Sequence, residues 1–554
     1  MVDAEEEPRL CSSFFHFRRE FMMSDCFNTE MSCETEGTDS RHLAATIMLQ
    51  GTASDVGKSL LATALCRIFK QDGRKVAPFK SQNMSLNSYV TPDGREIGRA
   101  QGMQADACGI AATTDMNPIL LKPTKDMASQ VVVHGKPLMD MAARDYREHY
   151  LPKAGAIVRE ALARLRDDND IVVIEGAGSP AEVNLKDRDI VNMRLAGWAD
   201  APVLLVADID RGGVFAAIVG TMEILEPEER DRVKGIIINK FRGDVSLLTP
   251  GLDWLEQRIG KPVLGVVPYL GGLQLEDEDG ASLDARGYRT RAASSDELDI
   301  AVIRLPRISN FTDFDPLQHE PGVVLRYVRH AREWGEPDIV IIPGSKNTVE
   351  DLLFLRESGL EALLLKHIRE GGRAVGICGG YQMMGQRLLD PDGVESNVPE
   401  LAGLCLFPME TVFAKEKTTE RVTGTFGAGL NEATTVEGYE IHMGRTTFTD
   451  PVMQPFRIRS SRLNEESTSY HLDGAISYDG LLWGTYIHHI FHNDQFRHNW
   501  LNEARHSKGL PLSEEVTPFG SLREMSFDRL ADHVRKHIDM AAIYEIMNGG
   551  SSNE

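Results

Sequence analysis

The sequence has few cysteines, no long apolar run and no excess of positive charge. Its seven cysteines include no C-x-x-C pair, which argues against a disulfide framework or a zinc site and predicts reduced thiols in the cytoplasm. No apolar segment approaches the ~20 residues that a transmembrane helix needs, which excludes a membrane protein. The formal net charge of −23 opposes binding to a phosphate backbone, so we expect no nucleic-acid partner.

The length of 554 residues predicts several domains, each large enough for its own core. Residues 1–42 differ from the rest because they are acidic, hold three of the cysteines and show no periodic pattern. They lack the basic start and apolar stretch of a secretory signal. We predict a disordered extension or a wrongly chosen start codon, with Met22, Met23 and Met31 as later starts.

Residues 43–275 alternate short apolar runs with longer helical patterns. The strand candidates are 44–50, 75–79, 171–175, 202–207, 235–239 and 262–267, and the first is followed by a helical pattern at 60–72. Such alternation predicts βαβ units, and therefore an α/β fold with a doubly wound, mostly parallel sheet.

A polar stretch at 276–297 reads as a linker, after which the alternation resumes. The second domain is predicted over 298–546, followed by a tail at 547–554. We expect strands at 298–303, 338–342, 373–377 and 481–487, helices at 317–334, 349–369 and 381–389, shorter strands after 401, and one closing helix at 523–546.

The segment G-T-A-S-D-V-G-K-S at 51–59 joins a strand to a helix, as a phosphate-binding loop does. Lys58 would neutralise the β- and γ-phosphates and the Ser59 hydroxyl would bind Mg²⁺. Five residues separate the two glycines where the usual loop has four, so Thr52 takes the first-glycine position. Ala53 stands where partition-type ATPases carry a signature lysine, which excludes that subgroup. The predicted ATP contacts are Gly51, Thr52, Ser54, Asp55, Val56, Gly57, Lys58 and Ser59.

Two acidic residues at the ends of predicted strands are further candidates for the Mg²⁺–ATP site. Glu175 ends the run I-V-V-I-E, and Asp208 follows V-L-L-V-A. A carboxylate in this position can bind the metal of a nucleotide complex. The alternatives are a plain turn at Glu175 and a cap or turn at Asp208.

Cys378 lies in G-I-C-G-G, between a predicted strand and a predicted helix. A thiol on such a turn is exposed near the positive end of a helix, which favours the nucleophilic thiolate. The backbone N–H of Gly379 could stabilise an oxyanion, and Gly344 in P-G-S-K-N could complete that site. A buried structural cysteine is the alternative. The base that the thiol needs is one of the adjacent histidines His488 and His489, at the end of another strand.

These residues belong to a longer series of segments that resembles the cobyric acid synthase family, from about residue 45 to 546. The segments are T-I-M-L-Q-G-T-A-S-D-V-G-K-S, F-K-S-Q-N-M-S-L-N-S, E-G-A-G-S-P-A-E-V-N-L, D-I-D-R-G-G-V-F, L-P-R-I-S-N-F-T-D-F-D-P-L, P-G-S-K-N-T, G-I-C-G-G-Y-Q-M-M-G, G-Y-E-I-H-M-G-R-T and G-T-Y-I-H-H-I-F. The resemblance implies a dethiobiotin synthetase-like P-loop domain followed by a class I-like glutamine amidotransferase domain.

The resemblance also implies an activity. Cys378 and His488 would hydrolyse glutamine through a thioester, and ATP would activate corrinoid carboxylates as acyl phosphates for attack by the released ammonia. The b, d, e and g carboxylates of adenosylcobyrinic acid a,c-diamide would be amidated to give adenosylcobyric acid. The partners are thus a corrinoid and L-glutamine, the cofactors ATP and Mg²⁺, and a homo-oligomer is compatible with the sequence.

Four residues are predicted to contact the substrate, and alternative functions remain open. The segment Q-N-M-S-L-N-S at 82–88, whose Gln82 and Asn83 are predicted substrate contacts, favours the cobyric acid synthase family over cobyrinic acid a,c-diamide synthase. Asn184 and Asp187 follow a strand end, where open α/β sheets bind ligands, and are predicted to contact the corrinoid unless they form a solvated loop. Ile490 stands where class I glutaminases have a glutamate, so the third triad member is unidentified. A non-catalytic nucleotide-binding regulator with a relict glutaminase domain is the alternative of another class.

Overall fold

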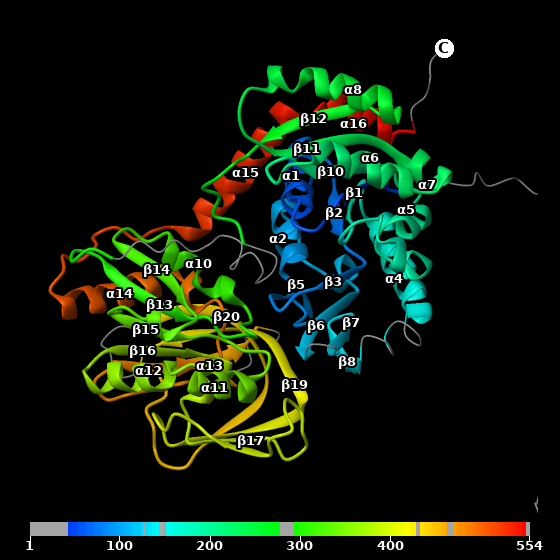
Figure 1. Cartoon of the computed structure of the whole chain (residues 1–554). Coiled ribbons are helices and arrows are strands. Elements are labelled where there is room, and N and C mark those ends of the chain that lie inside the picture. Colours follow the sequence, from blue (N-terminus) through cyan, green and yellow to red (C-terminus); the bar gives the residue numbers. More distant parts are fainter. Residues whose placement is uncertain are drawn as a thin grey trace, which may run out of the picture. The chain divides into compact units, whose positions relative to one another are not determined.

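Two mostly parallel sheets organise the protein in the computed structural model (Figure 1). The structure describes residues 43–125, 128–142, 146, 151–276, 293–427, 433–461 and 469–549. The predicted extension at 1–42, most of the predicted linker and most of the tail lie outside the described residues. Residues 43–554 form one compact unit.

The sheet of the first domain has the strand order β12-β11-β10-β1-β9-β2, and all its pairs are parallel. The strands are β1 (Ala45–Gly51), β2 (Val76–Phe79), β9 (Ile171–Glu175), β10 (Val203–Asp208), β11 (Val233–Phe241) and β12 (Val263–Pro268). All six predicted strands are confirmed within a few residues. Because β1 lies between β9 and β10, the loop after β1 is flanked by the carboxyl ends of these two strands, at Glu175 and Asp208.

Helices cover both faces of this sheet, as the doubly wound prediction requires. Along β1, Ile47 and Leu49 pack into one core cluster and Met48 into the other, which is the alternation of a strand buried on both faces. The first cluster includes α1 (Lys58–Gln71), α15 (Phe519–His537) and α16 (Met540–Met547). The second includes α4 (Leu151–Asp168), α5 (Met193–Ala199), α6 (Val214–Ile224) and α8 (Thr249–Ile259).

The predicted closing helix at 523–546 was wrong as a single helix. Ile538 is extended (φ −124°, ψ 141°), forms a bridge with Gly265 and separates α15 from α16. Both helices pack against α1 of the first domain, although we assigned this segment to the second. The other domain boundaries remain a prediction.

Smaller elements of the first domain extend from the carboxyl edge of its sheet. A four-stranded sheet contains β3 (Gln82–Met84), β6 (Ile119–Lys125), β7 (Ala128–Val133) and β8 (Lys136–Ala142). A hairpin of β4 (Ser88–Val90) and β5 (Glu96–Gly98) leads directly into α2 (Arg99–Cys108). The remaining pieces are α7 (Pro227–Arg232), η1 (Thr114–Met116), η3 (Val183–Arg188) and η4 (Val245–Leu247).

The second domain contains a six-stranded sheet in the order β14-β13-β15-β16-β24-β23, parallel except for β23. Its strands are β13 (Leu298–Ile303), β14 (Val323–Val328), β15 (Ile339–Ile342), β16 (Arg373–Ile377), β23 (Ala475–Ile476) and β24 (Leu482–Thr485). Its helical elements are η5 (Phe311–Phe314), α10 (Asp315–Gln318), η6 (Ala331–Glu333), α11 (Thr348–Glu357), α12 (Leu360–Arg369), α13 (Gly379–Met383), η7 (Ile490–His492) and α14 (Asp494–Lys508).

Several expectations for this domain were wrong. The predicted helix at 317–334 contains the strand β14, because V-V-L-R-Y-V is rich in β-branched and aromatic residues. The helix predicted at 349–369 is broken at Gly359, which adopts φ 76°, and the one at 381–389 ends at Met383. The segment after 401 holds the longest strands, β19 (Met409–Phe426) and β20 (Thr434–Phe448), not only short ones. They pair in a sheet with β17 (Arg387–Leu389), β18 (Glu400–Ala402), β21 (Phe456–Ser460) and β22 (His471–Asp473).

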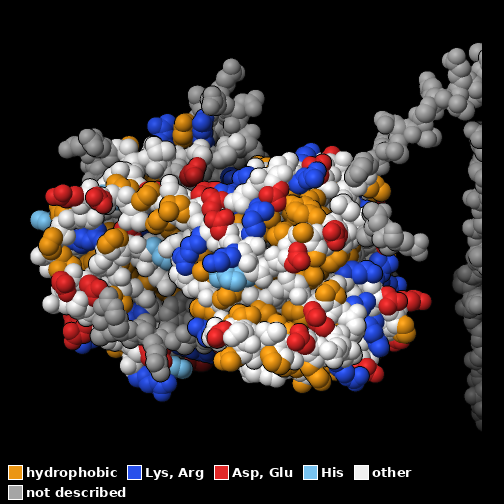
Figure 2. Space-filling model, turned by 90° about the horizontal axis from the view of Figure 1, so that it is seen from above, with side chains coloured by type: hydrophobic (Ala, Val, Ile, Leu, Met, Phe, Trp, Pro, Cys, Tyr) orange, Lys and Arg blue, Asp and Glu red, His pale blue; other side chains and the backbone are white. Residues whose placement is uncertain are grey.

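The space-filling view shows how charged side chains are distributed over one face of the molecule. Acidic and basic side chains are interspersed on the face shown in Figure 2, with no continuous basic stripe there. Among the described residues, no helix is both long and apolar enough to cross a bilayer.

Candidate functional site

Four strands of the second sheet end at one edge and bring the candidate glutaminase residues together. Gly344 follows β15, Cys378 follows β16, His488 follows β24, and Asp313 in η5 follows β13. Since β13, β15, β16 and β24 are consecutive parallel neighbours, their carboxyl ends share that edge. Residues far apart in sequence therefore meet at one site.

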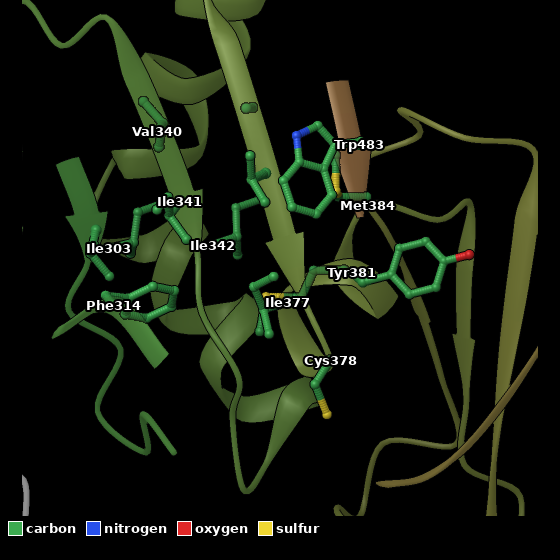
Figure 3. Packing of buried hydrophobic residues seen from close by; sticks show 14 of the residues in the cluster. Ile303, Phe314, Val340, Ile341, Ile342, Ile377, Cys378, Tyr381, Met384 and Trp483 are labelled. Carbon is green, nitrogen blue, oxygen red and sulfur yellow. The ribbon is translucent and has the colours of Figure 1, made fainter. Parts of the chain in front are cut away.

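Cys378 occupies a strained turn between β16 and α13. Its φ of 50° and ψ of −106° are unusual for a residue with a side chain. The turn is held by the Cys378 N–H, which donates to the Thr485 carbonyl at 2.8 Å. A Cβ at Gly380 would come within 1.9 Å of the Ile342 carbonyl oxygen, so only glycine fits there. In Figure 3 the thiol points away from the other labelled side chains of the cluster. Cys378 is only 6% exposed, so the expectation of an exposed thiol was wrong.

His488 is bound to a buried carboxylate. Its Nδ1 lies 2.6 Å from Oδ2 of Asp313, and both side chains are almost completely buried. Burial alone would lower the pKa of His488, but the charge of Asp313 and the charge and hydrogen bond of Cys378 outweigh it and raise the pKa to about 10. This arrangement favours the imidazolium form of His488, which lies beside the Cys378 thiol.

The two glycines predicted for the oxyanion site are neighbours in space. A Cβ at Gly379 would lie 2.9 Å from the Ser345 nitrogen, and one at Gly344 would lie 3.2 Å from Cε1 of His488. The Gly344 carbonyl accepts a hydrogen bond from the Ser309 N–H at 2.9 Å, which fixes this loop. The backbone of both loops can thus approach an acyl group on the thiol closely.

The structure distinguishes the two candidate bases. His489 adopts φ 64°, stacks on His492 with ring centroids 3.9 Å apart, and contacts Tyr439 edge-on. Among the described residues, Nε2 of His489 is buried without a hydrogen-bond partner. Burial, followed by the charge of His492, lowers the pKa of His489 well below its usual value. His488 is the histidine with the geometry of a base.

We expect His488→Ala to abolish glutamine hydrolysis and His489→Gly to preserve it. Relief of the left-handed backbone at 489 is worth about 1–2 kcal/mol, and the lost aromatic contacts cost about 0.5–1.5 kcal/mol, so the stability of His489→Gly should change little. Glutaminase assays and thermal unfolding of both variants check this. Loss of activity only in His489→Gly would reverse the assignment.

We expect Asp313→Asn to reduce glutamine hydrolysis by about 10²- to 10⁴-fold, because the amide cannot stabilise the imidazolium. The pKa of His488 should fall toward its ordinary value. Titration of His488 by NMR and the rate of glutamine hydrolysis measure these two effects. An unchanged rate would remove Asp313 from the site.

The predicted phosphate loop connects β1 to α1. Gly57 adopts φ 97° and caps α1, and a Cβ there would lie 2.2 Å from Nδ2 of Asn239. The Thr52 N–H donates to the Val206 carbonyl at 2.9 Å. The Lys58 ammonium donates to the carbonyls of Ala53 (3.0 Å) and Gly178 (3.2 Å), so it spans the loop. These contacts hold the loop open toward the helix N-terminus, where phosphates bind.

Glu175 is joined to the loop by a buried network. Its Oε1 accepts from the Ser59 hydroxyl and from the Lys80 ammonium, each at 2.8 Å, and its Oε2 accepts from Gln104 at 2.7 Å. Mg²⁺ prefers hard oxygen ligands and takes the others from phosphates and water. The adjacent oxygens of Ser59 and Glu175 fit that requirement, although no group of three or more His, Cys, Asp or Glu side chains suited to a metal occurs in the described part of the chain.

Asp208 lies in a different environment from Glu175. Its Oδ2 is 2.9 Å from the Lys240 ammonium and 3.7 Å from the Arg211 guanidinium. Its Oδ1 accepts from the Asp210 N–H at 2.8 Å, which is a turn-forming contact. Glu175 accepts a hydrogen bond from Ser59 of the loop, whereas the contacts described above for Asp208 are with Lys240, Arg211 and Asp210. The structure therefore supports Glu175 more strongly as a metal ligand.

A cavity of about 810 Å³ adjoins the loop. Of the predicted substrate residues, Gln82 and Asn184 line it, together with apolar side chains such as Met84 and Leu185. Asn83 is 3% exposed and donates to Gln101 at 3.1 Å, so it supports the framework instead. The side chain of Asp187 lies outside the described residues. A larger hollow of about 1290 Å³ lies at the amino ends of β10 and β12 and shares Met193 and Glu229 with this cavity, but none of the predicted site residues lines it.

Sequence reasoning missed four residues that the structure places at the sites. Asp313 and Lys80 lie within segments that already stood out as motifs, F-T-D-F-D-P and F-K-S-Q-N. Their charge within these motifs could have identified them as candidate site residues. Gln104 and Asn239 lie outside the motifs emphasised above, and their packing against Glu175 and the loop could only come from the fold.

Two family models match successive parts of the chain. Residues 299–496 match the CobB/CobQ-like glutamine amidotransferase domain, and residues 47–283 match the CobQ/CobB/MinD/ParA nucleotide binding domain. One solved structure, a glutamine amidotransferase, is 16% identical with a TM-score of 0.27, and the match covers 38% of this chain and 99% of that one; the score is too low to support an inference.

Curated relatives match almost the whole chain. A cobyric acid synthase of Geobacillus thermodenitrificans is 53% identical over 504 residues, which cover 90% of this chain and 98% of the relative. Those of Desulforamulus reducens and Dehalococcoides mccartyi (strain CBDB1) are each 52% identical, covering 92% of this chain and 99% or 100% of the relative. On these matches and the two-domain architecture, the chain belongs to the cobyric acid synthase family.

Proposed function

We propose that the protein uses glutamine and ATP to amidate the b, d, e and g carboxylates of adenosylcobyrinic acid a,c-diamide, giving adenosylcobyric acid. The observation that carries this proposal is the 2.6 Å contact between His488 and Asp313 beside the strained Cys378 turn. A cysteine, histidine and carboxylate in this arrangement suit the hydrolysis of an amide.

At the glutaminase site, the Cys378 thiolate attacks the side-chain amide of glutamine. The backbone at Gly344 and Gly379 stabilises the oxyanion, and His488 gives its proton to the departing ammonia. Water, deprotonated by His488, then hydrolyses the thioester to glutamate and restores the thiol. Asp313 keeps the imidazole in one orientation throughout.

At the other site, the loop at 51–59 binds ATP and Lys58 neutralises phosphate charge. Ser59 and Glu175 would hold Mg²⁺, which supplies charge neutralisation at the phosphates when bound. The substrate carboxylate takes the γ-phosphoryl group and ADP leaves. Ammonia then attacks the acyl carbon, inorganic phosphate departs, and the ammonia nitrogen loses its extra proton to give the amide.

The cavity beside the loop suits a large ligand with apolar and amide-bearing edges. Gln82 and Asn184 offer polar groups among the apolar side chains of Met84, Leu121 and Val131. Tyr146 donates to Oε1 of Gln82 at 2.6 Å, which orients the amide of Gln82. A corrinoid, whose periphery carries both amides and carboxylates, fits this lining.

Incubation with adenosylcobyrinic acid a,c-diamide, glutamine and MgATP, followed by mass spectrometry of the corrinoid, tests the proposal. We expect four added amides. Conversion of cobyrinic acid to its a,c-diamide instead would identify the related diamide synthase activity. If the protein has neither glutaminase nor synthetase activity, the result would support the alternative of a non-catalytic regulator.

A further inference from the structure

We propose that Arg99, a residue of the first domain, is a positioning residue for the base His488 in the second domain. This inference rests on the proposed role of His488 in glutamine hydrolysis. It arises from a chain of contacts that begins at Arg99, passes through Tyr439 and ends at the imidazole.

Tyr439 supports His488 through both its ring and its backbone. The two rings stack with centroids 5.2 Å apart and an angle of 17° between their planes. The His488 N–H donates to the Tyr439 carbonyl at 2.8 Å, and the Tyr439 N–H donates back at 3.3 Å. A displacement of the Tyr439 ring would therefore change the orientation of the imidazole.

Arg99 fixes the outer end of that tyrosine. Its Nη2 donates to the Tyr439 hydroxyl at 2.8 Å and to the Ser88 carbonyl at 2.5 Å. Arg99 is only 1% exposed, so the guanidinium has little room to move. A buried charge-assisted hydrogen bond is stronger than a neutral one and restricts the angle of the acceptor.

Ser88 belongs to the β4–β5 hairpin of the first domain, and it also contacts Asn310, a second neighbour of His488. The Ser88 N–H donates to Oδ1 of Asn310 at 2.8 Å, and Nδ2 of Asn310 lies 3.4 Å from Nε2 and 3.5 Å from Nδ1 of His488. Asn310 immediately precedes the helical turn that carries Asp313. The base is thus contacted by two residues that the first domain positions.

Helix α2 ties Arg99 to the nucleotide-binding domain. Gln104, five residues further along this helix, donates to Glu175 at 2.7 Å. Five residues of α-helix span only about 7.5 Å, so one short rigid element contacts both sites. The residue that positions Tyr439 therefore lies on the same short helix as a residue that contacts Glu175.

Arg99→Met and Tyr439→Phe, separately and together, test this inference in the full-length protein. We expect either single change to lower kcat for glutamine hydrolysis about 10- to 100-fold, because small misplacements of a base are costly, with KM changed much less. The double variant should be no worse than the singles. Arg99→Lys should recover part of the rate, and ammonia-dependent amidation should persist in all variants.

Arg421→Met is the matched control, because the Arg421 guanidinium also joins the domains, donating to the Val90 carbonyl at 2.8 Å and lying over the Tyr89 ring. Arg421 pairs with Tyr439 across β19 and β20 through its backbone, which the substitution leaves in place. Arg421→Met should leave glutamine hydrolysis nearly unchanged. Equal losses in Arg99→Met and Arg421→Met, or parallel loss of glutamine- and ammonia-dependent activity, would overturn the role of Arg99. Activity retained in His488→Ala would instead overturn the proposed function itself.

Discussion

Cys378→Ala is expected to abolish glutamine-dependent amidation while ammonia-dependent amidation continues. Only glutamine hydrolysis uses the thiolate, and removing the nucleophile of a catalytic triad costs on the order of 10⁴- to 10⁶-fold. The thiol is small; it donates a weak hydrogen bond to the Ile441 carbonyl at 3.7 Å and also interacts with His488. Its loss should therefore leave the fold and the distant phosphate loop intact. Product formation from glutamine and from ammonium chloride measures the two activities.

Cys405→Ala is the control for that experiment. Cys405 is another free cysteine in the same domain, but it is exposed and lies away from the Cys378 turn. It should keep both activities. Loss of ammonia-dependent amidation in a folded Cys378→Ala protein would contradict the separation of the two sites.

Lys58→Ala is expected to abolish amidation from either nitrogen source, while glutamine hydrolysis persists. Without the ammonium, the β- and γ-phosphate charge loses its counter-charge, and charge stabilisation with positioning dominates phosphoryl transfer. The substitution also removes hydrogen bonds to Ala53 and Gly178. Lys58→Met, which keeps the volume of the buried stem, therefore accompanies it. ATP-dependent amidation with ammonia is the measurement.

Lys75→Ala, a change at an exposed lysine before β2, provides the control for loss of one positive charge from the same domain. It should keep the wild-type rate. Unchanged amidation in Lys58→Ala would show that the nucleotide binds elsewhere.

Much of the fold could be predicted because the buried parallel strands carry a strong local signal. The run I-V-V-I-E at 171–175 is apolar, short and flanked by breakers, and it is a strand with the same bounds. The segment 317–334 failed because its apolar residues fit a helical period, while β14 owes its conformation to pairing with β13 over six residues. The β-branched and aromatic residues of β14 also favour a strand, but the partner strand that selects this conformation lies outside the local window.

The candidate sites likewise contain some residues that the local sequence identifies and others that only the fold brings together. Cys378, Lys58 and Ser59 were found because glycines around them enforce turns that the local sequence displays. Asp313 lies 175 residues before His488, so only the order of the parallel strands brings them together. The contact between Arg99 and Tyr439 spans 340 residues and two domains, which a pattern search within either domain cannot detect.

Transfer of nitrogen from the amide of glutamine to the corrinoid tests the central claim most directly. The protein is supplied with amide-¹⁵N-labelled glutamine, MgATP and the a,c-diamide, and the product is examined by mass spectrometry. We expect each new amide of the wild-type product to carry ¹⁵N, and Cys378→Ala to give no labelled product. Wild-type product without ¹⁵N, or equal labelling by Cys378→Ala, would contradict the account.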